Sequence, residues 1–109
     1  MDFSKLKGTI YFNNRYLPSK KANIHVLNHS LHFATSVFEG IAVYNNKPFL
    51  SDDHFKRLIK SAKLMKLKFD KNVKELEIIA NTLIKKNKIK NGYIRPIIFR
   101  SENSMSPDT

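Results

Sequence analysis

The chain has 109 residues, a formal net charge of +11 at pH 7 and no cysteine. A chain of this length can bury one hydrophobic core but not two, and the lack of cysteine excludes disulfides and thiolate metal sites. No long apolar run occurs, and the first residues lack the apolar stretch of a signal peptide. We therefore expect a cytoplasmic protein with no membrane partner.

The positive charge raises nucleic acid as a possible partner. However, Lys56, Lys60 and Lys63 share one stripe of a predicted helix, opposite an apolar stripe, as a solvated helix face does. The basic residues are also not interleaved with aromatic stacking platforms, so we expect no nucleic-acid partner. Only four of the 20 basic residues are arginine. Arg57 and Arg95 are therefore candidates for positions that need the planar guanidinium group, which lysine cannot replace.

The first predicted element is a β-hairpin. Residues 9–12 and 15–18 flank Asn13-Asn14, and asparagine tolerates the positive φ of a tight two-residue turn. Residues 19–28 are polar, and we expect them to be irregular.

Short elements fill the middle of the chain. We expect a helical turn over residues 30–34 and a strand over residues 37–44. Asn45-Asn46 predicts a second turn, after which residues 47–50 return as a partner strand.

Two helices follow. Residues 51–53 supply a hydroxyl or carboxylate cap for a helix that runs to about Lys66. Asn72 and Glu75 have capping-box spacing at the start of the second helix. The predicted apolar faces comprise Phe55, Leu58, Ile59, Ala62 and Met65 in the first helix, and Val73, Leu76, Ala80, Leu83 and Ile84 in the second.

A last strand starts at Asn91-Gly92. Residues 93–99 are very apolar, which predicts a central strand buried on both faces, and Pro96 predicts one irregular position because proline cannot donate to a ladder. Residues 101–109 are polar and predicted as a loop. Together the elements predict an α+β fold, with a mostly antiparallel sheet and two α-helices packed on one face.

The stretch from residue 25 to residue 41 carries a mixture that core packing does not explain. His25, His29 and His32 have a spacing that would suit a metal, but no carboxylate or thiolate completes the set, so we interpret them as ordinary hydrogen-bonded histidines and predict no metal site. Phe33 and Phe38 are either core aromatics or pocket residues.

Two arginines are candidates for binding an anion. Arg57 lies at the edge of the apolar stripe, so it is either a solvated helix residue or a clamp that binds a phosphate through two parallel hydrogen bonds. Arg95 lies inside an apolar strand, where its charge needs an anionic partner. Tyr93 faces the same side as Arg95, so that a phenol and a guanidinium are available for a ligand carboxylate.

Three segments resemble one family in the order in which they occur. Residues 28–41, 55–62 and 92–98 are similar to segments of the class IV, fold-type IV aminotransferases, which use pyridoxal 5′-phosphate, and most of all to their branched-chain amino acid branch. The resemblance extends over residues 9–99. It implies a set of site residues: Arg57 for the cofactor phosphate, and Phe33, Phe38, Gly40, Tyr93 and Arg95 for the substrate.

Within that set the resemblance implies separate roles. Phe38 lines the pocket for an aliphatic side chain, and Gly40 leaves room beside the cofactor. Tyr93 and Arg95 recognise the dicarboxylate substrate, glutamate or 2-oxoglutarate. The implied reaction exchanges an amino group between leucine, isoleucine or valine and 2-oxoglutarate, or between glutamate and the corresponding 2-oxo acids. The resemblance also implies a dimeric enzyme.

The family's Schiff-base lysine lies in a second, larger domain, so we assign no catalytic residue here. We expect residues 1–100 to form the N-terminal small domain and residues 101–109 to begin a truncated interdomain loop. On this interpretation we expect the pyridoxal phosphate-lysine domain to lie outside these 109 residues. We therefore expect little or no transaminase activity from the chain alone.

Two positions depart from the family pattern. Ala42 stands where bacterial branched-chain members commonly carry arginine, and Phe33 stands where many carry tyrosine. The D-amino acid and aminodeoxychorismate branches share the fold, although residues 38–40 and 93–95 favour the branched-chain branch. The alternative from another class is a non-catalytic remnant or binding module, including a basic domain that binds nucleic acid.

Overall fold

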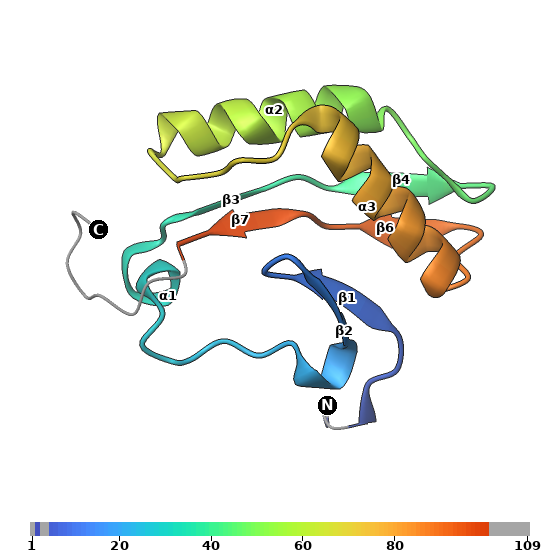
Figure 1. Ribbon diagram of the computed structural model, residues 1–109, viewed down its shortest axis with the longest axis horizontal. Helices are drawn as coiled ribbons and strands as arrows, with labels where there is room; N and C mark the ends of the chain where they lie inside the picture. The colour runs from blue at the N-terminus through green and yellow to red at the C-terminus, as the bar shows by residue number, and fades with distance from the viewer. Residues whose placement is uncertain (1, 3–4, 101–109) are drawn as a thin grey trace.

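The chain opens with the antiparallel hairpin of β1 (Thr9–Phe12) and β2 (Arg15–Pro18). The structure is a computed structural model that describes residues 2 and 5–100, and Figure 1 labels its helices and strands. Asn13 and Asn14 have φ values of 47° and 69°, the left-handed values that a type I′ turn requires. The predicted hairpin is confirmed.

A short helix, α1 (His29–Phe33), follows an irregular stretch that contains one 3-10 turn at Ser19–Lys21. The side chain of Asn28 caps α1 by accepting a hydrogen bond from the backbone N–H of Ser30. This confirms the helical turn predicted over residues 30–34.

The two longest predicted strands are each divided. Residues 37–44 form β3 (Ser36–Phe38) and β4 (Ile41–Tyr44), and the last strand forms β6 (Gly92–Ile94) and β7 (Ile97–Phe99). β3 pairs with β7, whereas β4 pairs with β6, so the halves belong to separate antiparallel sheets.

Both divisions fall at the same level, where Glu39 lies beside Pro96. The N–H of Glu39 donates to the carbonyl of Pro96 at 3.1 Å, but proline returns no donor, so the ladder is interrupted. The irregular position predicted at Pro96 is confirmed. The prediction that the last strand is buried on both faces is wrong, because Tyr93 and Ile97 are 55% and 52% exposed while Ile98 is buried.

The edge strand β5 (Lys47–Pro48) pairs with β4 and is shorter than the predicted residues 47–50. Asn45 and Asn46 form the predicted turn, again with positive φ. The strand ends early because Leu50 already adopts a left-handed conformation, with φ 52°, at the entry to the next helix.

That helix is α2 (Ser51–Leu64), and the side-chain cap predicted for it is wrong. Leu50 occupies the N-cap position and makes no side-chain cap. The hydroxyl of Ser51 donates instead to Glu77 on the neighbouring helix, at 2.8 Å. The two aspartates of the first turn still favour the helix because they lie at the positive end of its dipole.

The neighbouring helix is α3 (Val73–Lys86), and its predicted capping box is confirmed. Asn72 accepts from the N–H of Glu75, and Glu75 accepts from the N–H of Asn72. In Figure 1, α2 lies along one side of the β3–β7 pair, α3 crosses over β4 and β6, and the β1–β2 hairpin lies on the side of the strands away from α2. The end of α3 meets the hairpin, because Asn87 hydrogen-bonds to Thr9 of β1. The core between helices and strands comprises Ile41, Phe55, Leu58, Ala62, Leu67, Leu76, Ala80 and Ile98.

These observations confirm the α+β class, the antiparallel pairing and the two packed helices, with α1 as a third, short helix. The predicted apolar stripe of the first helix stops before Met65, which is 41% exposed. The loop predicted over residues 101–109 lies outside the described residues. Within the described part of the chain, no helix is both long enough and apolar enough to cross a membrane.

Candidate functional site

A buried carboxylate lies at the junction between β3 and β4, which we define as residues 38–40. Glu39 is 5% exposed, and three nitrogen atoms of α2 contact its two oxygens. Nε of Arg57 donates to Oε2 at 2.8 Å, Nη2 of Arg57 donates to Oε1 at 2.7 Å, and Nδ1 of His54 lies 2.7 Å from Oε1. Charged and polar groups thus join the junction to the second helix.

Electrostatics keeps this carboxylate ionised. The hydrogen bond from Arg57 lowers the pKa of Glu39 to about 2, against the opposing effect of burial and with help from His54. The same contact raises the pKa of Arg57 above its usual value. At neutral pH the pair therefore carries a full negative and a full positive charge.

Arg57 is the residue predicted to bind a phosphate. Its side chain is 68% exposed, although its guanidinium pairs with Glu39. Its Nε and Nη2 atoms use one edge of the guanidinium on Glu39. Within residues 5–100, no hydrogen bond engages Nη1. The structure thus links Arg57 to an acid of its own chain and leaves part of the guanidinium to solvent.

Four predicted substrate residues gather around the same junction. The guanidinium of Arg95 lies 4.1 Å from the ring centroid of Phe38, a cation–π contact. Tyr93 lies against Gly40, where an added Cβ would come within 2.5 Å of the tyrosine hydroxyl. The room that glycine leaves is thus taken by Tyr93 in this structure.

The anionic partner that Arg95 was expected to need is not present among the described residues. The reason is that Arg95 and Phe38 are both exposed, so the guanidinium keeps its hydration while one face stacks on the ring. Arg95 therefore avoids the desolvation penalty of a charge inside a buried strand.

The sixth predicted residue, Phe33, lies on α1 and packs against His29, with ring centroids 4.5 Å apart. His29 is fully buried, and its Nδ1 lies 2.8 Å from the hydroxyl of Thr35. His32 contacts the carbonyl of Val26 through Nε2. In the described part of the chain no cluster of three metal-ligating side chains forms, and these two histidines brace the loops around α1.

Sequence reasoning did not assign Glu39 or His54 to the site. A signal was present for both. An acid between apolar strand residues is buried at a cost unless cations meet it. His54 and Arg57 are three residues apart, which places them on one face of a helix where both can reach one partner.

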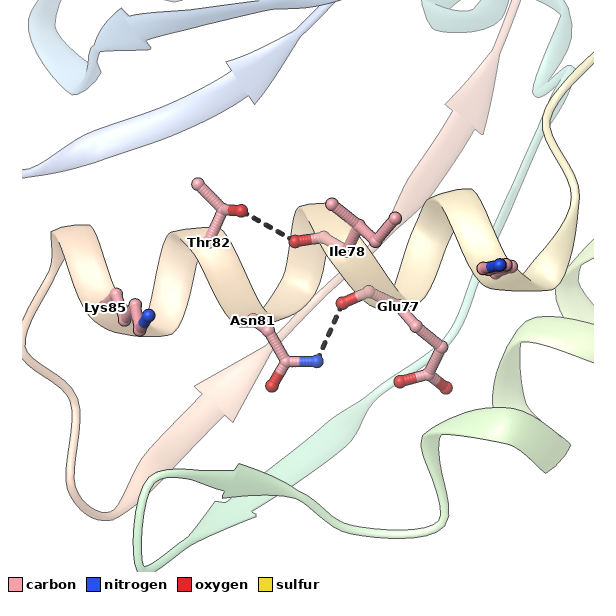
Figure 2. A pocket seen from close by; sticks show the side chains of 6 residues that line it. Glu77, Ile78, Asn81, Thr82 and Lys85 are labelled. Carbon is pink, nitrogen blue, oxygen red and sulfur yellow. Dashed lines mark hydrogen bonds between the residues drawn. The ribbon is translucent and has the colours of Figure 1, made fainter.

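The shallow hollows of the surface lie elsewhere. One runs along the exposed side of α3 (Figure 2), lined by Lys74, Glu77, Ile78, Asn81, Thr82 and Lys85. Asn81 and Thr82 donate to the backbone carbonyls of their own helix four residues earlier. These groups are satisfied locally, and no predicted site residue lines the hollow, so we give it no role.

Residues 36–109 match the family model described as amino-transferase class IV, and the chain belongs to this family. Among its relatives is a probable branched-chain-amino-acid aminotransferase from Rickettsia bellii, 42% identical over 89% of this chain and 34% of the relative. The chain spans about a third of the length of such relatives.

Solved structures show the same likeness. The branched-chain amino acid aminotransferase of Escherichia coli superposes with a TM-score of 0.87 at 35% identity, over 94% of this chain and 35% of that one. The T.th. enzyme of the same name, complexed with N-(5′-phosphopyridoxyl)-L-glutamate, has a TM-score of 0.87 at 31% identity, over 94% of this chain and 36% of that one.

Proposed function

We propose that residues 1–100 are the small domain of a branched-chain amino acid aminotransferase. The enzyme would exchange an amino group between leucine, isoleucine or valine and 2-oxoglutarate, as a cytoplasmic homodimer. The observation that carries the proposal is the gathering of five of the six predicted residues at one place: Phe38 and Gly40 belong to the junction, Tyr93 and Arg95 lie against it, and Arg57 reaches it through Glu39.

Pyridoxal 5′-phosphate is the proposed cofactor, and Arg57 fits its phosphate. A guanidinium has five N–H donors, of which Glu39 takes two, so three remain for a phosphate. A planar fork suits such an oxyanion better than a lysine does. When bound, the cofactor supplies the electron sink for carbanion chemistry.

The remaining residues would hold the substrate. Arg95 is stacked on Phe38, which restrains its orientation while its N–H edges stay available for a carboxylate. Tyr93 adds a phenol that can donate to the same carboxylate. The exposed side chain of Phe38 would offer apolar contact to a branched aliphatic side chain, and we assign Phe33 of α1 to the same role.

Phosphate recognition can be tested on the chain as it stands. Pyridoxine 5′-phosphate is the suitable probe, because the aldehyde of the cofactor would react with the many lysines. We expect the phosphate ester to shift the Arg57 resonances in NMR spectra, whereas pyridoxine, which lacks the phosphate, leaves them unchanged. In Arg57→Gln the response should disappear, and equal binding of the two compounds would contradict the proposal.

The chain alone should not transaminate. We expect leucine and 2-oxoglutarate to react no faster than with free pyridoxal 5′-phosphate. The proposed reaction needs a lysine that binds the cofactor covalently, and we assign that role to none of the lysines in this chain. The alternative, a non-catalytic binding module, is favoured by the exposed side chains of Phe38, Tyr93 and Ile97. A chain that self-associates through these residues without binding the phosphate ester would support that alternative.

A further inference from the structure

Glu39 is the one buried carboxylate among the described residues, and its burial needs an explanation. An apolar side chain at this position would tie the junction to α2 without the cost of desolvating a charge. The chain instead places an acid there, and meets it with two side chains from α2, Arg57 and His54.

The contact uses one particular edge of the guanidinium. Arg57 presents Nε and Nη2 to the two carboxylate oxygens, at 2.8 and 2.7 Å, which is a bidentate pair. The other edge, formed by Nη1 and the second hydrogen of Nη2, remains unused by the described residues. A planar guanidinium can therefore bind Glu39 on one edge and a second oxyanion on the other.

His54 completes the arrangement by holding the carboxylate. Its Nδ1 contacts Oε1, the oxygen that also accepts from Arg57 Nη2. The side chain of His54 is 24% exposed and that of Glu39 is 4% exposed, so two side chains of α2 hold the acid within the fold. A fixed acid in turn fixes the plane of a guanidinium whose side chain is otherwise mostly in water.

We propose that Glu39, supported by His54, is a positioning residue that holds Arg57 with its free edge presented to the phosphate monoester of the ligand. This inference rests on the proposed function of Arg57. A free arginine loses rotamer freedom when it binds an anion, and an arginine already held by Glu39 loses less.

Charge alone predicts the opposite effect. Glu39 partly neutralises Arg57, so on a purely electrostatic view its removal should tighten the binding of an anion. Positioning predicts that its removal weakens binding. The two views therefore differ in the sign of one measurement.

The test uses the ¹⁵N-labelled chain and pyridoxine 5′-phosphate. Only four arginines contribute Nε–H signals, and Arg57→Lys identifies the one of interest. In Glu39→Gln we expect a broadened, rapidly exchanging Arg57 Nε–H signal and about tenfold weaker binding of the ester. Asp52→Asn is the matched control, because it breaks an exposed ion pair with Lys56 on the same helix, and should change neither readout.

Each outcome has one meaning. Unchanged or tighter binding in Glu39→Gln overturns the positioning role while the phosphate role of Arg57 stands. If Arg57 of the unsubstituted chain does not respond to the ester, the proposed function of Arg57 fails, and the inference fails with it. Should Glu39→Gln not fold, the partly exposed His54→Ala carries the test: we expect about threefold weaker binding, and no change overturns the proposal.

Discussion

The β1–β2 hairpin and the residue 38–40 junction are stabilised in different ways. The hairpin is a regular ladder around a type I′ turn, with Tyr11 packed edge-on to Tyr16. The junction has no continuous ladder, and side-chain hydrogen bonds to Glu39 replace it. Repetitive backbone pairing suits a structural element, whereas a break in the ladder frees side chains and backbone for a site.

The largest expected difference between the two regions comes from shortening one isoleucine in each. Ile41 begins β4 beside the junction and is fully buried, whereas Ile10 in β1 is 40% exposed. Ile41→Ala should lower the free energy of unfolding by about 3 kcal/mol, because it leaves a cavity. Ile10→Ala should cost less than about 1 kcal/mol. Urea unfolding measures both free energies. Equal losses in the two variants would contradict the greater burial of Ile41 in the core.

The junction should respond to acid. Because the folded-state pKa of Glu39 is about 2, below its usual 4.5, the ionised form stabilises the fold above pH 4.5, and this contribution is lost as pH falls toward 2. The loss should be about 2 kcal/mol, reduced by the exposure of the Arg57 side of the pair.

The matched variant for this pH dependence is Glu39→Gln. Its unfolding free energy should change less between pH 5 and pH 2.5 than that of the unsubstituted chain. Parallel pH profiles in the two proteins would show that other carboxylates account for the acid sensitivity.

The hairpin has its own long-range attachment, at Asn87. The amide of Asn87 accepts from the N–H of Thr9 at 2.8 Å and donates to the carbonyl of Thr9 at 3.0 Å. Asn87→Ala should therefore destabilise the fold by about 1 kcal/mol and speed amide hydrogen exchange in β1. Asn81→Ala removes only a local helix contact and is the control. Similar exchange rates in both variants would contradict this attachment.

The smallest effect is expected at the exposed pair of Lys56 and Asp52, whose side chains are 66% and 59% exposed. Asp52→Asn should leave the urea midpoint unchanged within error, because solvent screens such pairs. A clear shift would mean that ion pairs along α2 act as a network that includes Arg57.

The hairpin, both helices and the capping box followed from local sequence. Asn13-Asn14 fixes a turn, and Asn72 with Glu75 fixes a helix start, because each signal lies within a few residues of what it controls. An irregular position at Pro96 also followed, but the division of both long strands into separate pairs did not. It depends on Pro96 meeting Glu39 across more than fifty residues, and a strand pattern read from one segment carries no information about its partner.

The candidate site, like the fold, was predictable only in part. The resemblance pointed to residues that gather at the junction, but it did not reveal that Arg57 already has an acidic partner. That partner is a tertiary contact between a strand end and a helix. Nor did the resemblance indicate that Arg95 stacks on Phe38 instead of pairing with an acid. The exposure of a strand face depends on which other elements cover it, and the sequence of the strand does not show this.

Leu50 gives the orientation of α2 an unusual origin. A bulky residue with φ 52° and ψ 35° is strained by about 1 kcal/mol, since its Cβ approaches the following carbonyl. The asparagines of the two turns adopt similar angles more easily. The direction in which the helix leaves the sheet is thus set by backbone handedness at one leucine. His54 and Arg57 lie within the next two turns, and the N–H of His54 donates to the carbonyl of Leu50 at 3.2 Å. The direction in which both side chains reach toward Glu39 therefore depends on the backbone conformation of this leucine.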